Sequence, residues 1–384
     1  MSMIQSVKQN SSIEAFFILI RAGLFGRIEG AGGLLPDHVD WAEVYQLALE
    51  QRVIGLVTEG MEILQHECSA PLVPQAWTVK FVSVTLQMEK LNQTMNRFVA
   101  GLVNKLRKNG INSLLLKGQG VAQSYEKPLW RVCGDVDLLL SEKDYQKAKD
   151  FLLPFVSCSD PEDKFKKHVG ITIGGWLVEL HGSLRCGFSS RIDRELDKVY
   201  EDTMLGGKWR SWMNRKVEVF MMREENDVLY VFTHFLNHFF KGGIGVRQIS
   251  DWSRLLWSFR DSLDLQYLES RLKDMGLMSE WKAFGMYAVE YLGMPEYAMP
   301  LFDDSDKWKQ KAQLIHEFII KSGSVGYQRM KMKMEKNGEK ESFLTRKVES
   351  SGHRACDLAS ISRIFPMDTL RFFPSIVENG IRQK

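Results

Sequence analysis

The chain has 384 residues, enough for two or three domains, and its 44% hydrophobic and 26% charged residues exclude a largely disordered or fibrous protein. Its 51 basic and 48 acidic residues leave a net charge of +3, which argues against bulk binding to nucleic acid or to membranes. The five cysteines form no Cys-x-x-Cys pair, and no window approaches the roughly 18 uncharged apolar residues of a membrane span. We therefore expect a soluble, cytoplasmic protein.

The first part of the chain, residues 12–110, has the apolar periodicity of helices. Apolar residues recur every three or four positions from Asp40 to Leu64, which predicts one helix with Asp40 as its N-terminal cap. The pattern repeats from Leu86 and stops at Asn109-Gly110, a usual helix end. We predict an N-terminal helical region over residues 1–85.

The period changes after Gly110. Short apolar runs predict strands at 113–117, 135–140, 176–182 and 215–222, with a helix between the second and the third. Two alternating segments on either side of Gly174-Gly175 predict a hairpin. Residues 111–222 therefore predict a small mixed sheet with helices packed on it, an α+β or α/β arrangement.

Helical periodicity returns at residues 224–258 and 263–293, so we predict a C-terminal helical region over 223–384 after a core domain at 86–222. The charged segment 329–342 is interpreted as a solvated helix end and loop, with a basic nucleic-acid site as the less favoured alternative.

Two carboxylates, Asp135 and Asp137, lie in the otherwise apolar run "RVCGDVDLLL". An ionised carboxylate in an apolar setting must be neutralised, because its isolated burial costs several kcal/mol or more. Alternate residues of a strand share a face, so the two acids project together about 7 Å apart. Glu179 lies in a similar apolar strand, and three carboxylates on neighbouring strands can hold a pair of divalent ions. The alternatives are acids exposed at a strand end and, for Glu179, an edge-strand residue that faces solvent.

A turn upstream suits phosphate. In "LLLKGQG", a strand leads into a glycine-containing turn and a short helix, and this arrangement presents backbone N–H groups and Lys117 to phosphate oxygens. The alternative is a surface lysine that follows a strand.

The order of these motifs resembles the nucleotidyltransferase superfamily related to DNA polymerase β: a strand with "LLKG" and a helix, then "GDVDLLL", then the acid of "VELH". More narrowly, the chain resembles a bacterial family of uncharacterised nucleotidyltransferases with an early "DWAEVYQLALEQRV" helix and a later His-x3-His and Arg-x3-Asp region. The last feature is present as His234, His238, Arg247 and Asp251. The resemblance spans roughly residues 40–256, and one departure is Lys117-Gly118-Gln119 where better-studied members have Gly-Ser or Gly-Gly.

The resemblance implies an α+β fold with a polymerase β-like mixed-sheet core flanked by N- and C-terminal helical regions. It also implies two Mg²⁺ ions, with Mn²⁺ as an alternative, held by Asp135, Asp137 and Glu179. Glu179 would complete the acceptor-side ion and take the acceptor's proton. The residues expected to contact the nucleotide are Lys117, Gly118, Arg131, His181 and Arg247.

Several of these residues have structural alternatives. Arg131 is placed either for a phosphate contact or for an ion pair with a local acid. His181 is either a residue of the nucleotide site or a structural histidine. Arg247 and Asp251 are spaced for an ion pair within one helix. We favour packing or substrate-side hydrogen bonding over zinc binding for His234 and His238, because the sequence offers no third ligand beside them.

The predicted reaction moves an NMP group from an NTP, ATP included, to an acceptor hydroxyl with release of pyrophosphate. The alternatives are a non-catalytic nucleotide-binding regulatory protein with the same fold, and a toxin–antitoxin type enzyme that modifies tRNA or protein. The near-neutral charge disfavours tRNA. The sequence leaves the acceptor, the base and the oligomeric state open. Mutual repulsion predicts a raised pKa for at least one of the three acids without metal.

Overall fold

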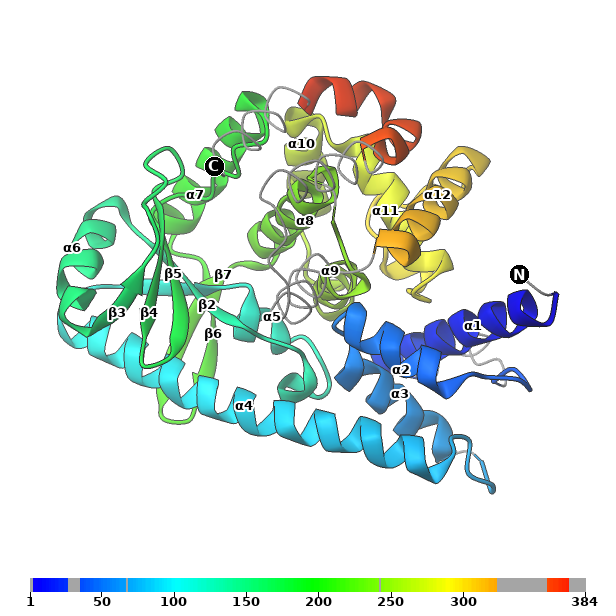
Figure 1. Cartoon of the computed structure of the whole chain (residues 1–384). Coiled ribbons are helices and arrows are strands. Elements are labelled where there is room, and N and C mark those ends of the chain that lie inside the picture. The colour runs from blue at the N-terminus through cyan, green and yellow to red at the C-terminus, as the bar shows by residue number, and fades with distance from the viewer. Residues whose placement is uncertain (1–2, 27–34, 67, 242, 323–357, 373–384) are drawn as a thin grey trace, which may run out of the picture. The chain divides into compact units, whose positions relative to one another are not determined.

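The computed structural model describes residues 3–26, 35–66, 68–241, 243–322 and 358–372, and the side chains from residue 11 onward (Figure 1). The chain divides into two compact units, and neither is one continuous stretch. One comprises residues 1–85, 234–253 and 278–384, and the other comprises 86–233 and 254–277. The predicted division into three consecutive regions stays a prediction, because these units record compactness and not independent folding. The segment 329–342 lies outside the described residues.

The described part of the first unit is helical. Its elements are α1 (Met3–Phe25), α2 (Trp41–Glu50), α3 (Ile54–Gln65), the start of α4 (Gln75–Lys108), the end of α8 (Glu224–Phe240), most of α9 (Val246–Phe259), α11 (Met278–Glu290), the short η3 (Glu296–Ala298), α12 (Asp306–Ser322) and helical residues at 358–372. No helix among the described residues is long and apolar enough to cross a membrane.

The prediction of one continuous helix over residues 40–64 is wrong. The chain forms two helices, α2 and α3, because Arg52 adopts a positive φ of 57° that a continuous right-handed helix does not allow. The predicted cap is confirmed: Asp40 accepts hydrogen bonds from the backbone N–H groups of Ala42 and Glu43.

The second unit contains a seven-stranded mixed sheet in the order β3-β4-β5-β2-β1-β7-β6. Its strands are β1 (Ser113–Leu116), β2 (Asp135–Leu140), β3 (Val156–Ser159), β4 (His168–Ile173), β5 (Trp176–His181), β6 (Trp209–Asn214) and β7 (Val217–Met222). The β2–β5 and β1–β7 pairs are parallel, and the other pairs are antiparallel. The expected mixed sheet is therefore confirmed. The two edge strands, β3 and β6, were not predicted, and both are largely exposed.

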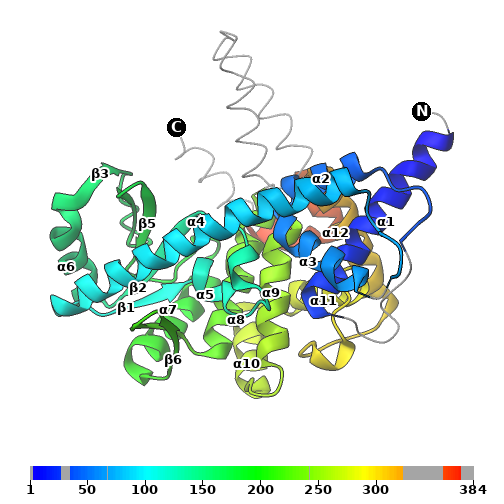
Figure 2. The ribbon, with the colours of Figure 1, turned by 90° about the horizontal axis from the view of Figure 1, so that it is seen from below.

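The sheet separates an apolar face from a polar one. The apolar core joins strand residues to helices α4 and α6 (Glu142–Leu152), with Val99, Leu106, Val136, Leu138, Leu140, Ala148, Val178 and Leu180 among its members. Helix α4 runs along the lower side of the strands in Figure 1 and stands in front of them in Figure 2. Since side chains alternate along β2, Asp135 and Asp137 project from the opposite face.

The remaining elements of this unit connect the strands or follow the sheet. They are α5 (Gly118–Ala122), η1 (Pro128–Trp130), η2 (Leu153–Phe155), α7 (Ser190–Gly206) and α10 (Leu265–Met275). The predicted hairpin between β4 and β5 is confirmed, with Gly174 and Gly175 at positive φ angles of 57° and 82°.

Candidate active site

The structure brings the three predicted acids together on the polar face of the sheet. Strands β2 and β5 pair in parallel with Asp137 opposite Glu179, and Asp135 lies two residues earlier on β2. One carboxylate oxygen from each acid lies within 4.8 Å of the others. The Asp137 side chain is only 1% exposed, so its charge requires a close partner.

Lys117 is one such partner. It directly follows β1, whose last residue, Leu116, pairs with Asp137 in the antiparallel β1–β2 register. Lys117 Nζ lies 2.8 Å from Asp137 Oδ1. Burial by itself would lower the pKa of Lys117, but the nearby carboxylates, Asp137 first, raise the pKa well above its usual range. The lysine is therefore a cation, and it neutralises Asp137.

Two imidazoles also contact the acids. His181 Nε2 lies 2.9 Å from Asp137 Oδ1 and 3.6 Å from Glu179 Oε2, and His168 Nε2 lies 3.3 Å from Glu179 Oε2. Burial alone would lower the pKa of His181, but its bonds to the two carboxylates raise it. Burial would raise the pKa of Glu179, whereas hydrogen bonds from both histidines and the charge of Lys117 lower it well below its usual range. Mutual repulsion therefore does not raise the pKa of Glu179, because the hydrogen bonds from the two histidines and the charge of Lys117 outweigh it. The raised pKa expected for at least one of the three acids stays a prediction.

The turn after β1 approaches β2 closely. Lys117 and Gly118 both have positive φ angles, 41° and 42°. A Cβ atom at Gly118 would stand 3.2 Å from the backbone oxygen of Asp135, which is tight for a side chain. A non-glycine residue in such a conformation costs about 1–3 kcal/mol, so the surrounding structure holds Lys117 in a strained position next to the acids.

Arg131 supports this turn. Its guanidinium donates to the carbonyl oxygen of Gly118 at 3.0 Å and to Cys133 Sγ at 2.9 Å, and the residue is buried. Asn92 of α4 donates to the Arg131 carbonyl oxygen and accepts from Gln119, so the helix, the turn and the strand entry are linked. These contacts support a positioning role for Arg131, and its contact with a nucleotide stays a prediction.

The sequence interpretation missed two residues at the site, His168 and Tyr230. A two-residue turn places residues at equal distances from it opposite each other, so the hairpin at Gly174-Gly175 already pairs His168 with His181. That signal was available in the sequence. The Tyr230 ring centre lies 5.9 Å from Lys117 Nζ, a contact between distant segments that no local pattern indicates.

Four other residues of the sequence motifs belong to the first unit. His234 and His238 lie on α8 with their Nε2 atoms 3.2 Å apart, and Arg247 and Asp251 lie one turn apart on α9. The predicted helical placement is confirmed for all four residues. The nucleotide contact expected of Arg247 stays a prediction.

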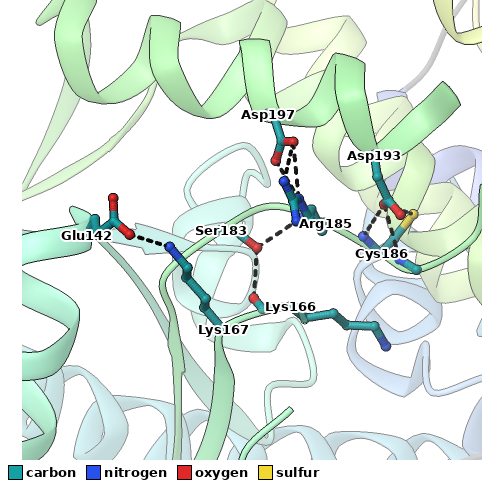
Figure 3. A network of polar contacts seen from close by, with 9 residues as sticks. Glu142, Lys166, Lys167, Ser183, Arg185, Cys186, Asp193 and Asp197 are labelled. Atoms are coloured by element: carbon teal, nitrogen blue, oxygen red, sulfur yellow. Dashed lines mark hydrogen bonds and ion pairs between the residues drawn. The ribbon is translucent and has the colours of Figure 1, made fainter. Parts of the chain in front are cut away.

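Polar contacts fix the ends of β4 and β5 that carry the two histidines (Figure 3). The Lys167 carbonyl oxygen accepts from the Gly182 N–H at 2.7 Å, and the Lys166 carbonyl oxygen accepts from Ser183 Oγ at 2.7 Å. The loop that follows is held in turn by Arg185, whose guanidinium donates to both carboxylate oxygens of Asp197. These contacts hold the backbone just before His168 and just after His181.

Comparison with known protein families agrees with these features. Residues 37–293 match the model of a family described as uncharacterised nucleotidyltransferase, and a comparison with curated proteins found no match. The match covers more than half of the chain and contains the acids, the turn and both histidines. The resemblance to this family drawn from the sequence motifs is therefore confirmed. The chain belongs to the uncharacterised nucleotidyltransferase family, and it is an enzyme of that class that acts on a nucleotide and an acceptor.

Proposed function

We propose that this enzyme transfers an NMP group from an NTP to an acceptor hydroxyl, in a metal-dependent reaction that releases pyrophosphate. The observation that carries the proposal is the parallel register of β2 and β5, which gathers Asp135, Asp137 and Glu179 within 4.8 Å. The succession of β1, a glycine turn, the Asp-x-Asp strand and a third acid on the adjacent strand also supports a polymerase β-like classification.

The donor set fits divalent cations. Mg²⁺ prefers carboxylate and phosphate oxygens, and the site offers one oxygen atom from each of three buried or half-buried carboxylates, next to a strained turn. Asp135, Asp137 and Glu179 would hold two such ions, Mg²⁺ or alternatively Mn²⁺. When bound, the ions lower the pKa of the acceptor hydroxyl and offset the charge of the leaving pyrophosphate.

In the proposed reaction, individual side chains have distinct roles. The acceptor oxygen forms a bond to the α-phosphorus of the NTP, the bond from that phosphorus to the bridging oxygen of the β-phosphate breaks, and pyrophosphate leaves. Glu179 takes the acceptor's proton, since its carboxylate lies beside the other two acids and its side chain is partly exposed. Lys117 neutralises phosphate charge, and Gly118 allows the close approach of the backbone to the nucleotide.

The test compares wild type with Asp137→Asn, which retains the size of the side chain and removes its charge. We expect the variant to lose Mg²⁺-dependent pyrophosphate release by at least about 100-fold, because an interaction made in the transition state is lost. Asp150→Asn is the matched control, because Asp150 is an exposed residue of α6 that accepts a hydrogen bond from Gln146. Equal release by wild type and Asp137→Asn would reject the proposal.

One observation favours a second candidate, a regulatory protein that binds a nucleotide without reacting. The Lys117 ammonium group already occupies the position next to Asp137 that a metal ion would need. An increase in melting temperature with an NTP and Mg²⁺, without pyrophosphate release in the presence of a metabolite or lysate pool, would support that candidate. Incubation with each labelled NTP and such a pool identifies the acceptor class, tRNA and protein included, from the molecule that carries the label.

A further inference from the structure

The site holds a second group of potential ligands besides the three acids. His168 begins β4, His181 ends β5, and the two residues are direct partners in the antiparallel register with ring centres 4.7 Å apart. Glu179, on the same strand as His181, lies against both rings. One ligand atom from each of the three residues lies within 4.8 Å of the others.

The distances within this group are those of ligands around one ion. The two Nε2 atoms lie 3.3 Å and 3.6 Å from Glu179 Oε2, and His181 Nε2 lies 2.9 Å from Asp137 Oδ1. Ligands about 2.1 Å from a metal ion stand about 3.4 Å apart in tetrahedral geometry and about 3.0 Å apart in octahedral geometry. His168, Glu179 and His181 therefore need little rearrangement to coordinate an ion, and Asp137 joins them once the Lys117 ammonium group leaves its Oδ1 atom.

The group is also held in place from outside. Figure 3 shows the Ser183 hydroxyl group donating to the Lys166 carbonyl oxygen, which joins the loop before β4 to the loop after β5. Farther along that loop, Asp193 accepts hydrogen bonds from the backbone N–H groups of Cys186 and Gly187. These contacts limit the movement of the backbone next to the two histidines, which favours a preformed site.

We propose that His168, Glu179 and His181 form a binding site for a first-row transition-metal ion, with Asp137 as a fourth ligand from β2. Two imidazoles and carboxylates suit Mn²⁺, Fe²⁺, Co²⁺ or Zn²⁺ better than Mg²⁺, which prefers all-oxygen ligands. According to this inference, one of the two ions held by the acids is a transition-metal ion with nitrogen ligands. The role of that ion in catalysis rests on the proposed function. Metal binding itself is independent of whether transfer occurs.

The test uses Mn²⁺ alone, without nucleotide, and pulsed electron paramagnetic resonance. We expect hyperfine coupling to ¹⁴N from the imidazoles in wild type, and tighter binding of Mn²⁺ than of Mg²⁺ in calorimetric titration. His168→Ala should weaken Mn²⁺ binding by at least about tenfold and reduce the ¹⁴N signal. The matched control is His66→Ala, since His66 is exposed at the end of α3, and it should change neither quantity.

Two further variants extend the test of Mn²⁺ binding. His168→Gln retains a polar side chain and should also reduce the ¹⁴N signal, so the test survives if the alanine variant unfolds. Asp135→Asn should weaken Mg²⁺ binding while the ¹⁴N coupling to Mn²⁺ persists. Absence of ¹⁴N coupling in wild type, or unchanged Mn²⁺ affinity in folded His168 variants, would overturn the inference even if Mg²⁺-dependent pyrophosphate release is found. Coupling without pyrophosphate release would retain the metal site and reject the proposed reaction.

Discussion

Lys117 is the residue on which the metal-free site depends most directly. Its ammonium group lies 2.8 Å from the nearly inaccessible carboxylate of Asp137, and His181 contacts the same oxygen atom. In the nucleotide-bound enzyme, the proposed phosphate contact would replace this ion pair. The residue would thus serve both as the counter-ion of the resting site and as a ligand of the substrate.

The first prediction removes this counter-ion. Lys117→Met should lower the free energy of unfolding of the metal-free protein by about 3 to 5 kcal/mol, because it leaves a buried carboxylate with only His181 as its neutralising partner. Mn²⁺ should restore part of the loss. Urea denaturation with and without the ion measures both effects. Lys273→Met, which removes an exposed ion pair with Glu269, is the control and should change stability by less than about 1 kcal/mol.

A second prediction at the scale of single residues concerns Glu280, a buried acid of α11. Burial, followed by the charge of Asp368, raises the pKa of Glu280 to about 8, while the nearby ammonium group of Lys311 opposes the shift. The folded state therefore holds this proton to higher pH than the unfolded state does. The contribution to stability is fully present below the ordinary pKa of Glu, and it is lost as the pH rises from about 4.5 toward 8.

Glu280→Gln should remove this part of the pH dependence. Between pH 5 and pH 8 the wild type should lose stability relative to the variant, with a slope of at most about 1.4 kcal/mol per pH unit. Urea unfolding midpoints at several pH values measure the difference. Parallel profiles for the two proteins would show that Glu280 does not retain its proton in this range.

At the scale of elements, the turn between β1 and α5 has a strained backbone conformation, and it lies next to the acids of the candidate site. Gly118→Ala should cost about 1–2 kcal/mol for its positive φ, and it should also displace β2 at Asp135, 3.2 Å away. We expect a loss of stability together with a loss of pyrophosphate release. Gly110→Ala is the control, because Gly110 also has a positive φ but no atom lies within 4 Å of the added Cβ. It should reduce stability and leave pyrophosphate release unchanged.

Two helix glycines give opposite expectations. Gly60 of α3 approaches α1 so closely that a Cβ atom would lie within 1.9 Å of the Leu19 carbonyl oxygen, so Gly60→Ala should destabilise the first unit by at least about 3 kcal/mol. Gly101 is exposed on α4 with no atom within 4 Å of the added Cβ, so Gly101→Ala should stabilise the protein by about 0.5–1 kcal/mol. Thermal unfolding of the two variants checks the signs, and a stabilising Gly60→Ala would contradict the close helix contact.

Elements with strong local signals could be predicted, and elements without them could not. The apolar run of β2 and the glycine pair between β4 and β5 are local features, and both predictions are confirmed. The edge strand β6 has few buried residues, so its sequence lacks the apolar alternation of a half-buried strand. The break between α2 and α3 at Arg52 carries no proline or glycine that would have marked it.

At the scale of the whole molecule, the metal-free protein should be stably folded. Lys117 and His181 lie against Asp137, and hydrogen bonds from His168 and His181 reach Glu179, so the burial of these acids does not require a metal ion. Chelation with EDTA should therefore leave the circular dichroism spectrum unchanged. The Mg²⁺ complex of an NTP, at about 100 times its dissociation constant, should add about 2.7 kcal/mol of stability. Unfolding on chelation would instead indicate that the acids depend on metal for their neutralisation.

The sequence by itself determined the sheet-containing core, the face shared by Asp135 and Asp137, and the pairing implied by the Gly174-Gly175 hairpin. These features follow from residue periodicity and turn geometry, which act over a few neighbouring residues. Only the tertiary structure decided that Asp137 lies opposite Glu179 and against Lys117, because strand order and register join segments that are distant in the chain. It also decided how the acids are neutralised, since the charge of a buried group depends on which cations the fold brings within a few ångströms of it.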